Sequence, residues 1–323
     1  MLVRSSCVKV PKSNGETLRK KLIELGAMDK SLRIKSDDRF LYIPILDKKL
    51  VPAGTEVTIE QFEEIEKPKT LEEILGFAPS YEIAGDIAIL TEGSMEVGKA
   101  ILKVHKNVKT VLVALSPVKG EFRVRRYRVI AGERRTETVH KEYGCLYALD
   151  LQRVYFSPRL STERARVAAQ VKPNETVVDM FAGVGPFSVL IAKRVKRVIA
   201  IDKNPDATLF LRKNIALNSI TNIQIIEGDV HEVSPNLKGQ GDRIIMNLPH
   251  SAEEYLDDAM VIAKPGATVH YYDIQPEDSF EEAIEMVRKA AARHGCKIKV
   301  IGMRKVRSYA PHRYNICIDF QVM

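Results

Sequence analysis

Asn174-Glu-Thr-Val-Val-Asp-Met-Phe-Ala-Gly-Val-Gly-Pro-Phe187 is the stretch around which the chain is organised. Its Val177-Val-Asp179 segment has consecutive β-branched apolar residues followed by an acid, which is typical of the end of a buried parallel strand. Gly183 and Gly185 allow the backbone to turn tightly and to approach a ligand without a Cβ. Phe187-Ser-Val-Leu-Ile-Ala-Lys193 then continues as a helix. We predict a ligand at this strand end, as in open α/β sheets.

Three later predicted strands also end in polar residues: Val198–Asp202, Ile223–Asp229 and Arg243–His250, the last through Asn247-Leu-Pro-His250. Asp202 follows the turn by about 20 residues, the spacing at which a carboxylate reaches a ribose diol. The third acid, Asp229, is placed to meet an adenine, although it also suits the N-cap of a helix. A glycine turn alone fits a dinucleotide site or an ordinary turn, but the dinucleotide fingerprint has a third glycine where this chain has Ser188. The order of strand ends resembles a class I S-adenosylmethionine-dependent methyltransferase.

Composition narrows the class of partner and the compartment. The 323 residues carry a formal net charge of +8, and 45% of them are hydrophobic, so two or three domains with sizeable cores are expected. A basic chain favours a polyanionic partner, although it also aids solubility. The four cysteines are scattered without metal-ligand spacing, which indicates reduced thiols in a cytoplasmic protein. No apolar run has the length of a signal peptide or a membrane span.

Four segments are expected along the chain: a small α/β domain over 1–66, a linker over 67–80, a basic α/β domain over 81–155 and an α/β catalytic domain over 156–323. Alternation and helical spacing predict the elements. The predicted strands are 2–10, 40–46, 83–90 (broken at Gly85), 110–115, 121–130 and 267–273, with 297–301 and 314–322 as a closing hairpin. The predicted helices are 15–25, 71–75, 95–105, 205–218, 253–262 and 280–294, and another begins near Ser161.

The most basic stretch of the chain lies in the 81–155 segment and comprises Arg123, Arg125, Arg126, Arg128, Arg134 and Arg135. In a strand over 121–130, Arg123 and Arg125 would share one face and Arg126 and Arg128 the other. This stretch is a candidate for binding nucleic-acid phosphates. The alternative is a solvated sheet edge, where Lys and Arg prevent strand-to-strand aggregation.

A more specific resemblance rests on motifs spread over roughly residues 75–323. The chain is similar to the archaeal and eukaryotic tRNA (guanine-37-N1)-methyltransferases in Gly85–Leu90, Ala131-Gly-Glu133, Thr138–Gly144, Tyr155–Arg164, Val178–Phe187, Met246–Pro249 and Arg307-Ser-Tyr-Ala-Pro311. The motifs occur in family order, which makes the resemblance specific. The first 66 residues carry no motif that can be matched in the same way.

The resemblance implies a reaction and assigns roles to residues. Guanine N1 is a poor nucleophile until it loses its proton, so a base must accept that proton, and Glu163 is the implied base. Negative charge then grows on O6, where a cation lowers the barrier; Arg123 is the implied cation and Arg125 the second choice. Asn247 would hold the guanine edge. Without the resemblance, Glu163 and Arg164 would be interpreted as an exposed pair at a helix start.

The implied contacts form two sets. The S-adenosylmethionine contacts are Phe156, Arg164, Asp179, Phe181, Ala182, Gly183, Gly185, Asp202, Lys203, Asp229, Val230, Asn247 and Pro249, and the tRNA contacts are Arg123, Arg125, Arg126, Arg128, Arg134, Arg135 and His250. His250 stays open between a contact to base or phosphate and an ordinary helix-start residue. Asn247-Leu-Pro-His250 departs from the Asn-Pro-Pro-aromatic pattern, which points away from exocyclic adenine amines. Methyl transfer from a sulfonium to nitrogen requires no metal.

Two alternatives remain at this stage. Related wyosine-pathway enzymes act on the same nucleotide, either by methylating carbon of a tricyclic guanine derivative or by transferring the aminocarboxypropyl arm of the cofactor. A non-enzymatic RNA-binding protein is the more remote alternative, because it predicts damaged cofactor motifs, whereas Asp179, Gly183, Asp202 and Asn247 are all retained. We expect a cytoplasmic monomer that acts on tRNA without a membrane partner.

Overall fold

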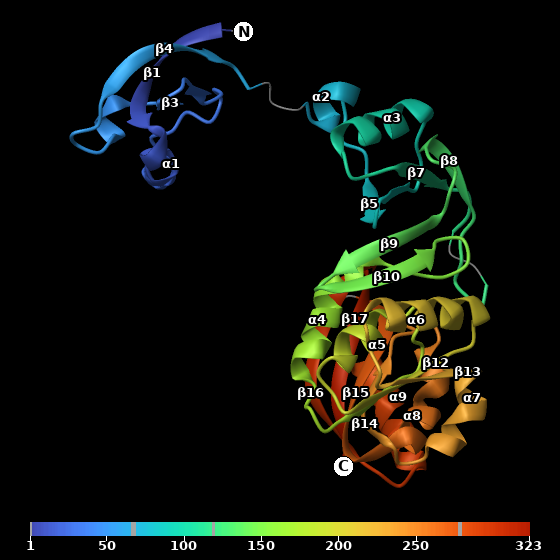
Figure 1. Ribbon diagram of the computed structural model, residues 1–323. Coiled ribbons are helices and arrows are strands. Elements are labelled where there is room, and N and C mark those ends of the chain that lie inside the picture. Colours follow the sequence, from blue (N-terminus) through green and yellow to red (C-terminus); the bar gives the residue numbers. More distant parts are fainter. Residues whose placement is uncertain (1, 66–68, 118–119, 277–279) are drawn as a thin grey trace. The chain divides into compact units, whose positions relative to one another are not determined.

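The computed structural model divides into two compact units, residues 1–74 and residues 75–323 (Figure 1). The structure describes residues 2–65, 69–117, 120–276 and 280–323. Residues 66–68, at the end of the predicted first domain and the start of the predicted 67–80 linker, lie outside the described residues. The second unit contains both the predicted middle domain and the predicted catalytic domain, so a domain boundary near residue 155 stays a prediction.

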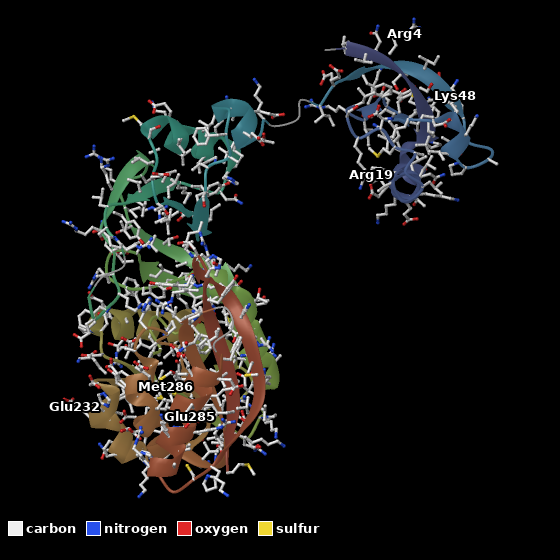
Figure 2. The ribbon with its side chains drawn as sticks, turned by 180° about the vertical axis from the view of Figure 1, so that it is seen from behind. Arg4, Arg19, Lys48, Glu232, Glu285 and Met286 are labelled. Carbon is white, nitrogen blue, oxygen red and sulfur yellow. The ribbon has the colours of Figure 1, made fainter. Side chains whose placement is uncertain are left out.

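The first unit is an antiparallel sheet with one helix packed against it. The strand order is β2-β3-β1-β4, with β1 at Leu2–Pro11, β2 at Lys35–Ser36, β3 at Phe40–Pro44 and β4 at Val57–Glu63. Helix α1 (Gly15–Glu24) inserts Leu22 between Val8 and Ile43, and all three are fully buried. The two predicted strands and the helix are confirmed to within two residues. Figure 2 labels Arg4, Arg19 and Lys48 among the side chains of this unit.

The second unit begins with a small sheet of strand order β5-β6-β7-β8. Its strands are β5 (Tyr81–Ala84), β6 (Ile87–Leu90), β7 (Thr110–Ala114) and β8 (Tyr127–Gly132), and its helix is α3 (Met95–Val104). The short helix α2 (Leu71–Leu75) contains the boundary between the two units, which falls after Ile74. The predicted strand broken at Gly85 is in fact an antiparallel hairpin. Gly85 has a φ of +58°, and a Cβ there would lie 2.1 Å from Thr138 Oγ1. Glycine is required at this turn for both reasons.

The predicted strand over 121–130 is wrong in its first half, since β8 begins only at Tyr127. Arg123 has a φ of +55°, a left-handed conformation that ends an extended run. The assignment of Arg123 and Arg125 to one strand face therefore fails. The turn carries both arginines away from the sheet, and they line a cavity together with Tyr155.

A hairpin for which no element was predicted separates the small sheet from the large one (Figure 1). Its strands β9 (Glu137–Glu142) and β10 (Cys145–Asp150) are joined by Tyr143 and Gly144, which both have positive φ. Two central residues with positive φ match the twist of a two-residue hairpin turn. The hairpin is tied to the small sheet by Asp86, whose backbone N–H donates to Thr138 Oγ1 at 3.2 Å.

Two asparagines of helix α6 (Pro205–Leu217) and its C-cap hold the other side of this hairpin. Asn214 accepts from the N–H of Ala148 at 2.7 Å and donates to the same residue's carbonyl at 3.1 Å, and Asn218 bonds Leu146 in the same way. Four residues advance a helix by about 6 Å, and two residues advance a strand by about 6.6 Å. The spacing of the two asparagines therefore matches β10.

The large sheet has the strand order β13-β12-β11-β14-β15-β17-β16. Its strands are β11 (Thr176–Asp179), β12 (Arg197–Asp202), β13 (Ile223–Glu227), β14 (Gly241–Met246), β15 (Ala263–Pro276), β16 (Ile298–Ala310) and β17 (Arg313–Val322). Strands β13, β12, β11, β14 and β15 pair with one another in parallel. Strand β17 pairs antiparallel with β15 on one side and with β16 on the other. The Rossmann-like arrangement and the closing hairpin are as predicted.

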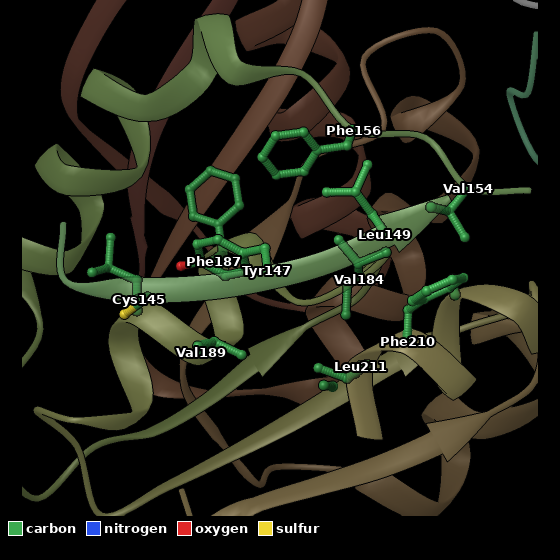
Figure 3. Close-up of a cluster of buried hydrophobic side chains, with 14 of the residues drawn as sticks. Cys145, Tyr147, Leu149, Val154, Phe156, Val184, Phe187, Val189, Phe210 and Leu211 are labelled. Atoms are coloured by element: carbon green, nitrogen blue, oxygen red, sulfur yellow. The ribbon is translucent and has the colours of Figure 1, made fainter. Parts of the chain in front are cut away.

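Helices cover both faces of the large sheet (Figure 1). In addition to α6 they are α4 (Ser161–Gln170), α5 (Pro186–Ala192), α7 (Val230–Val233), α8 (Leu256–Ile262) and α9 (Phe280–Arg293). No helix among the described residues is both long and apolar enough to cross a bilayer. One apolar core lies on each face of the sheet. Figure 3 shows alternate β10 residues, Cys145, Tyr147 and Leu149, packed against Phe187 and Leu211.

Asn214→Ala should destabilise the second unit by about 3 kcal/mol or more. The change strands the N–H and C=O of Ala148 and the carbonyl of Val184 in the interior, and each stranded group costs about 1–3 kcal/mol. Asn218→Ala is the matched control, because Asn218 makes the same kind of bonds at a half-buried position and should cost less. Urea unfolding measures both, and equal losses would argue against the role of Asn214.

Candidate active site

A cavity of about 450 Å³, which we call the strand-end cavity, opens at the carboxyl ends of β11 to β14. The chain leaves β11 toward β12 on one side while β14 pairs on the other, and ligands of open α/β sheets bind at such a switch point. The volume suits a small molecule. Its lining includes these predicted site residues: Arg123, Phe181, Gly183, Asp202, Lys203, Asp229, Val230, Asn247, Pro249 and His250.

The two glycines of the turn have different physical roles. Both have positive φ, +56° for Gly183 and +87° for Gly185. A Cβ on Gly183 would meet nothing closer than 4.0 Å, whereas one on Gly185 would lie 2.3 Å from Leu211 Cδ1. Gly183 therefore keeps the cavity wall open, and Gly185 allows close packing of the turn against α6. Asp202 fixes the turn, since its Oδ2 accepts from the N–H of Gly183 at 2.6 Å.

Asp179 supports the site from behind the lining. It is almost fully buried, and its Oδ2 accepts from Ser188 Oγ at 2.7 Å. Burial, with a contribution from the charge of Asp202, raises the pKa of Asp179 to about 7. Ser188, at the position where a dinucleotide fingerprint has its third glycine, thus bonds the first strand-end acid. Asp179, Ala182 and Gly185 shape the turn but do not line the cavity.

Asp229 serves as a helix cap and also lines the cavity. Its Oδ1 accepts from the N–H of His231 at the start of α7, and its Oδ2 accepts from Lys203 Nζ at 3.0 Å. Asp229 is therefore the N-cap of α7, and it is also one of the residues that line the strand-end cavity. Phe181 and Tyr255 meet edge to face at 4.9 Å on the same wall, so an apolar surface for a planar ring lies beside the acid.

A second cavity of about 510 Å³, which we call the arginine cavity, adjoins the first. The residues that line both are Gly120, Arg123, Tyr155, His250 and Arg307. The guanidinium of Arg123 lies 5.3 Å from the centre of the Tyr155 ring. Among the described residues, no carboxylate lies within 4 Å of Arg123 or Arg307. These two cations therefore favour an anionic or electron-rich ligand at the junction.

Burial lowers the pKa of both His250 and Arg123, and neighbouring arginines lower the pKa of His250 further. His250 is therefore neutral near pH 7 and offers a hydrogen bond, not a charge. His250 lines both cavities, and its ring meets the ring of Tyr309, a residue of the arginine cavity, edge to face at 5.1 Å. An ordinary helix-start position does not describe it, because the short 3-10 helix that follows begins at Ala252.

Arg164 lines neither cavity. The structure therefore does not place it where it could contact a cofactor in the strand-end cavity, as the resemblance implied. Arg164 is 1% exposed, and its guanidinium bonds both oxygens of Glu142 and the carbonyl of Ser157. Its guanidinium also lies 5.3 Å from the Phe156 ring, which lines the arginine cavity. The exposed-pair interpretation of Glu163 and Arg164 is wrong, since both are buried.

Glu163 lies behind the wall of the strand-end cavity. Arg166 donates to both of its oxygens, at 2.9 and 2.6 Å, and Tyr272 Oη donates to Oε1 at 2.7 Å. One helical turn earlier, Leu160 lines the cavity. The predicted base is thus adjacent to the cavity but engaged with other side chains.

The basic stretch divides by environment. Arg125 lines the arginine cavity, and Arg126, Arg128 and Arg134 are exposed or nearly so. Arg135 differs, because it bonds both oxygens of Asp86 and one of Glu133. Its charge is already neutralised, so it ties the hairpin to the small sheet and is poorly placed for a phosphate.

Several lining residues were not predicted. Tyr155 and Arg307 stand inside motifs that carried the resemblance, so their motif membership was a signal. Asn315 and Tyr255 lie outside these motifs, so no motif marked them in the sequence. Asn315 is the cross-strand partner of Arg307, a relation that only the sheet register reveals.

An open sheet with acids at successive strand ends and a glycine turn at its switch point defines a class I methyltransferase. Residues 138–300 match the TRM5/TYW2 methyltransferase domain, residues 7–49 the tRNA methyltransferase 5 N-terminal domain, and residues 63–136 the TYW2 N-terminal domain. The chain belongs to the TRM5/TYW2 methyltransferase family.

Relatives cover the chain to different extents. It is 44% identical to tRNA (guanine(37)-N(1))-methyltransferase Trm5b of Pyrococcus abyssi, over 98% of both chains. It is 36% identical to the tRNA(Phe) (4-demethylwyosine(37)-C(7)) aminocarboxypropyltransferase of Methanocaldococcus jannaschii, over 74% of this chain and 96% of the relative.

Two solved structures bear on ligands. A complex of aTrm5 and tRNALeu has a TM-score of 0.74 and 38% identity, covering 98% of this chain and 99% of that one. The M. jannaschii TYW2 in complex with AdoMet has a TM-score of 0.62 and 32% identity, covering 75% of this chain and 99% of that one.

Asp202→Ala should weaken S-adenosylmethionine binding by about 1.5–3 kcal/mol, the value of a charge-assisted hydrogen bond. The change also frees the N–H groups of Gly183 and Asn204 that Asp202 holds. Asp206→Ala, on the exposed side of the same region, is the control. Calorimetry should show tRNA affinity unchanged in both variants, and unaltered cofactor affinity in Asp202→Ala would remove the ribose assignment.

Proposed function

We propose that this chain transfers the methyl group of S-adenosylmethionine to N1 of guanosine 37 in tRNA, acting as a cytoplasmic monomer. The observation that carries the proposal is the junction of two cavities at Arg123, Tyr155 and His250. One cavity has strand-end acids suited to a nucleoside, and the other has arginines and tyrosines suited to a flipped nucleotide. Full-length similarity to a guanine-37-N1 enzyme supports the choice of target.

The strand-end cavity fits S-adenosylmethionine in residue type. Asp202 presents a half-buried carboxylate that suits a ribose diol, and desolvation raises the pKa of this group. Phe181 and Tyr255 offer an apolar wall for adenine beside Asp229. When bound, the cofactor supplies an electrophilic methyl group on its sulfonium. Asn247, directly after β14, lines the same cavity.

The residues of the chain supply the remaining chemistry. In our proposal, the Glu163 carboxylate accepts the proton of guanine N1, and Arg123 donates to O6, where negative charge develops. Within the part of the chain that the structure describes, no carboxylate pairs with Arg123 and competes for its charge. Arg166 and Tyr272 donate three hydrogen bonds to Glu163, and a carboxylate has about four lone-pair positions, so one position on Oε2 is left for the N1 proton. Asn247 orients the guanine edge.

The wyosine-pathway alternative is less well supported. The wyosine-pathway relative and structure cover 74% and 75% of this chain, whereas the Trm5b relative covers 98%. Residues 7–49 match a tRNA methyltransferase 5 domain, which fits the longer architecture. Incubating tRNA with labelled cofactor, followed by nucleoside mass spectrometry, tests the proposal directly. A methyl on guanine N1 supports it, and a modified tricyclic base or an aminocarboxypropyl adduct would overturn it.

Glu163→Gln should reduce the single-turnover methyl-transfer rate by about two to four orders of magnitude, the usual scale for a positioned base. The amide keeps the shape but cannot accept the N1 proton. Cofactor and tRNA affinities should change little, because the loss is felt in the transition state. Single-turnover conditions are needed since product release can hide a chemical defect. A variant as fast as wild type would remove Glu163 from the mechanism.

Binding of tRNA should weaken steeply with salt, because arginines that neutralise phosphates release counterions. Arg126→Gln and Arg128→Gln should each lower the slope of log affinity against log salt by about 1. Arg293→Gln is the matched control, since Arg293 is exposed but already paired with Asp257. Filter binding over a salt series measures the slopes. Unchanged slopes in the first two variants would indicate a solvated surface instead of a phosphate contact.

A further inference from the structure

A chain of buried polar groups runs from Glu163 across the sheet. Arg166 bonds Glu163 on one side and both oxygens of Asp319 on the other. His270 Nδ1 lies 2.6 Å from Asp319 Oδ1, and His270 Nε2 lies 2.8 Å from Arg243 Nη1. Arg243 ends the chain in a bidentate pair with Glu175. We call this set the α4 charge chain.

The hydrogen bonds fix the protonation of His270. A guanidinium can only donate, so His270 Nε2 must accept from Arg243, and the proton is on Nδ1, which donates to Asp319. His270 is therefore neutral. Burial and the two nearby arginines lower its pKa, in agreement with this assignment. Burial alone would raise the pKa of Asp319, but hydrogen bonds from His270 and Arg166 hold it well below its ordinary value.

The other titratable groups around Glu163 are neutral. Cys317 Sγ lies 3.4 Å from Arg166 Nη2 and 3.3 Å from Asp319 Oδ1. Burial raises the pKa of the Cys317 thiol and of the Tyr272 phenol. The charges that face Glu163 are thus Arg166 and, beyond it, Asp319. At the other end of the α4 charge chain, the opposite charges of Arg243 and Glu175 neutralise each other.

Residues of the α4 charge chain share a strand face with a residue that lines the strand-end cavity. Asn315, Cys317 and Asp319 point to one face of β17, because alternate residues of a strand share a face. Asn315 lines the cavity, and Tyr272, which bonds Glu163, is the cross-strand partner of Cys317. Glu163 is therefore bonded to a residue whose cross-strand partner, Cys317, is two positions along β17 from the cavity-lining Asn315.

The net charge of the α4 charge chain determines whether Glu163 can accept a proton without leaving Arg166 unpaired. Glu163, Arg166 and Asp319 together carry one negative charge, because one guanidinium is shared by two carboxylates. When Glu163 takes a proton, its O–H bond forms as the N1–H bond breaks, and Arg166 remains fully paired with Asp319. A Glu163–Arg166 pair without Asp319 would instead leave a buried guanidinium unpaired, at a high cost.

We propose that Asp319 is a positioning residue that makes Glu163 a stronger base by competing for Arg166, and that Tyr272 acts in the opposite sense by bonding Glu163 directly. This inference rests on the proposed role of Glu163. It assigns a function to a cluster that could be mistaken for a metal site. The ligand-type atoms of His270, Cys317 and Asp319 lie within 4.8 Å of one another, but Arg166 and Arg243 already bond the cluster, and their charges exclude a cation.

The test is the pH dependence of single-turnover methyl transfer in Asp319→Asn and Tyr272→Phe. Asp319→Asn keeps the shape and one acceptor oxygen, but it removes the competing charge, and its NH2 group cannot accept from Arg166. Arg166 then stabilises ionised Glu163 more strongly. The midpoint of the rising limb should move down by about one pH unit or more, and the plateau rate should fall because the base is weaker. Tyr272→Phe removes a hydrogen bond to the carboxylate, so the midpoint should move up.

Asp257→Asn is the matched control, because it neutralises a carboxylate paired with Arg293 on the exposed face of α8, and its midpoint should equal that of wild type. Thermal unfolding and cofactor affinity are measured for every variant, and a purely structural role predicts lost stability with an unmoved midpoint. Shifts of the same sign in both variants, or no shift, overturn the inference. If Glu163→Gln is fully active, the proposed base fails instead, and that result is distinguishable because it does not involve Asp319.

Discussion

The second unit depends on the buried ion pair between Arg164 of α4 and Glu142 of β9. Both side chains are nearly inaccessible, and the guanidinium bonds both carboxylate oxygens and the carbonyl of Ser157. Taking two charges out of water is costly, and only a fully bonded geometry offsets that cost. Burial would raise the pKa of Glu142, but the bonds from Arg164 outweigh it and lower the pKa. The pair fixes the hairpin against the helix, and with it the wall that carries Phe156.

The strand-end acids divide the work of the site among them. Asp179 is buried behind the glycine turn and bonds Ser188, Asp202 holds the turn through the N–H of Gly183, and Asp229 caps α7. Each carboxylate therefore has a structural task before any ligand arrives. An ionised carboxylate accepts several hydrogen bonds, so Asp202 and Asp229 keep capacity for a nucleoside while they hold the backbone. The same side chains can shape the cavity and bind in it.

The parts of this structure that the sequence predicted are local or periodic. Val177 to Asp179 could be assigned to a strand because the pattern that marks a strand end is carried by neighbouring residues, and parallel packing then brings Asp202 and Asp229 to one edge. The turn at Arg123 and the reversal at Gly85 depend on contacts with distant residues, such as Thr138. The partners of Glu163 and Arg166 were beyond reach, because Tyr272 lies 109 positions away and Asp319 lies 153 positions from Arg166.

The four residues Glu163-Arg-Ala-Arg166 show how one helix serves both parts of the site. Each residue advances an α-helix by about 100°, so residues three apart lie on nearly the same side and the next residue is turned well away. Glu163 and Arg166 consequently face the sheet together, where Asp319 completes their charges. Arg164 faces the hairpin and Glu142. The helix thus holds the Glu163 carboxylate near the strand-end cavity and anchors the wall of the arginine cavity. A register shift of one residue would exchange these directions and place each charge without its partner.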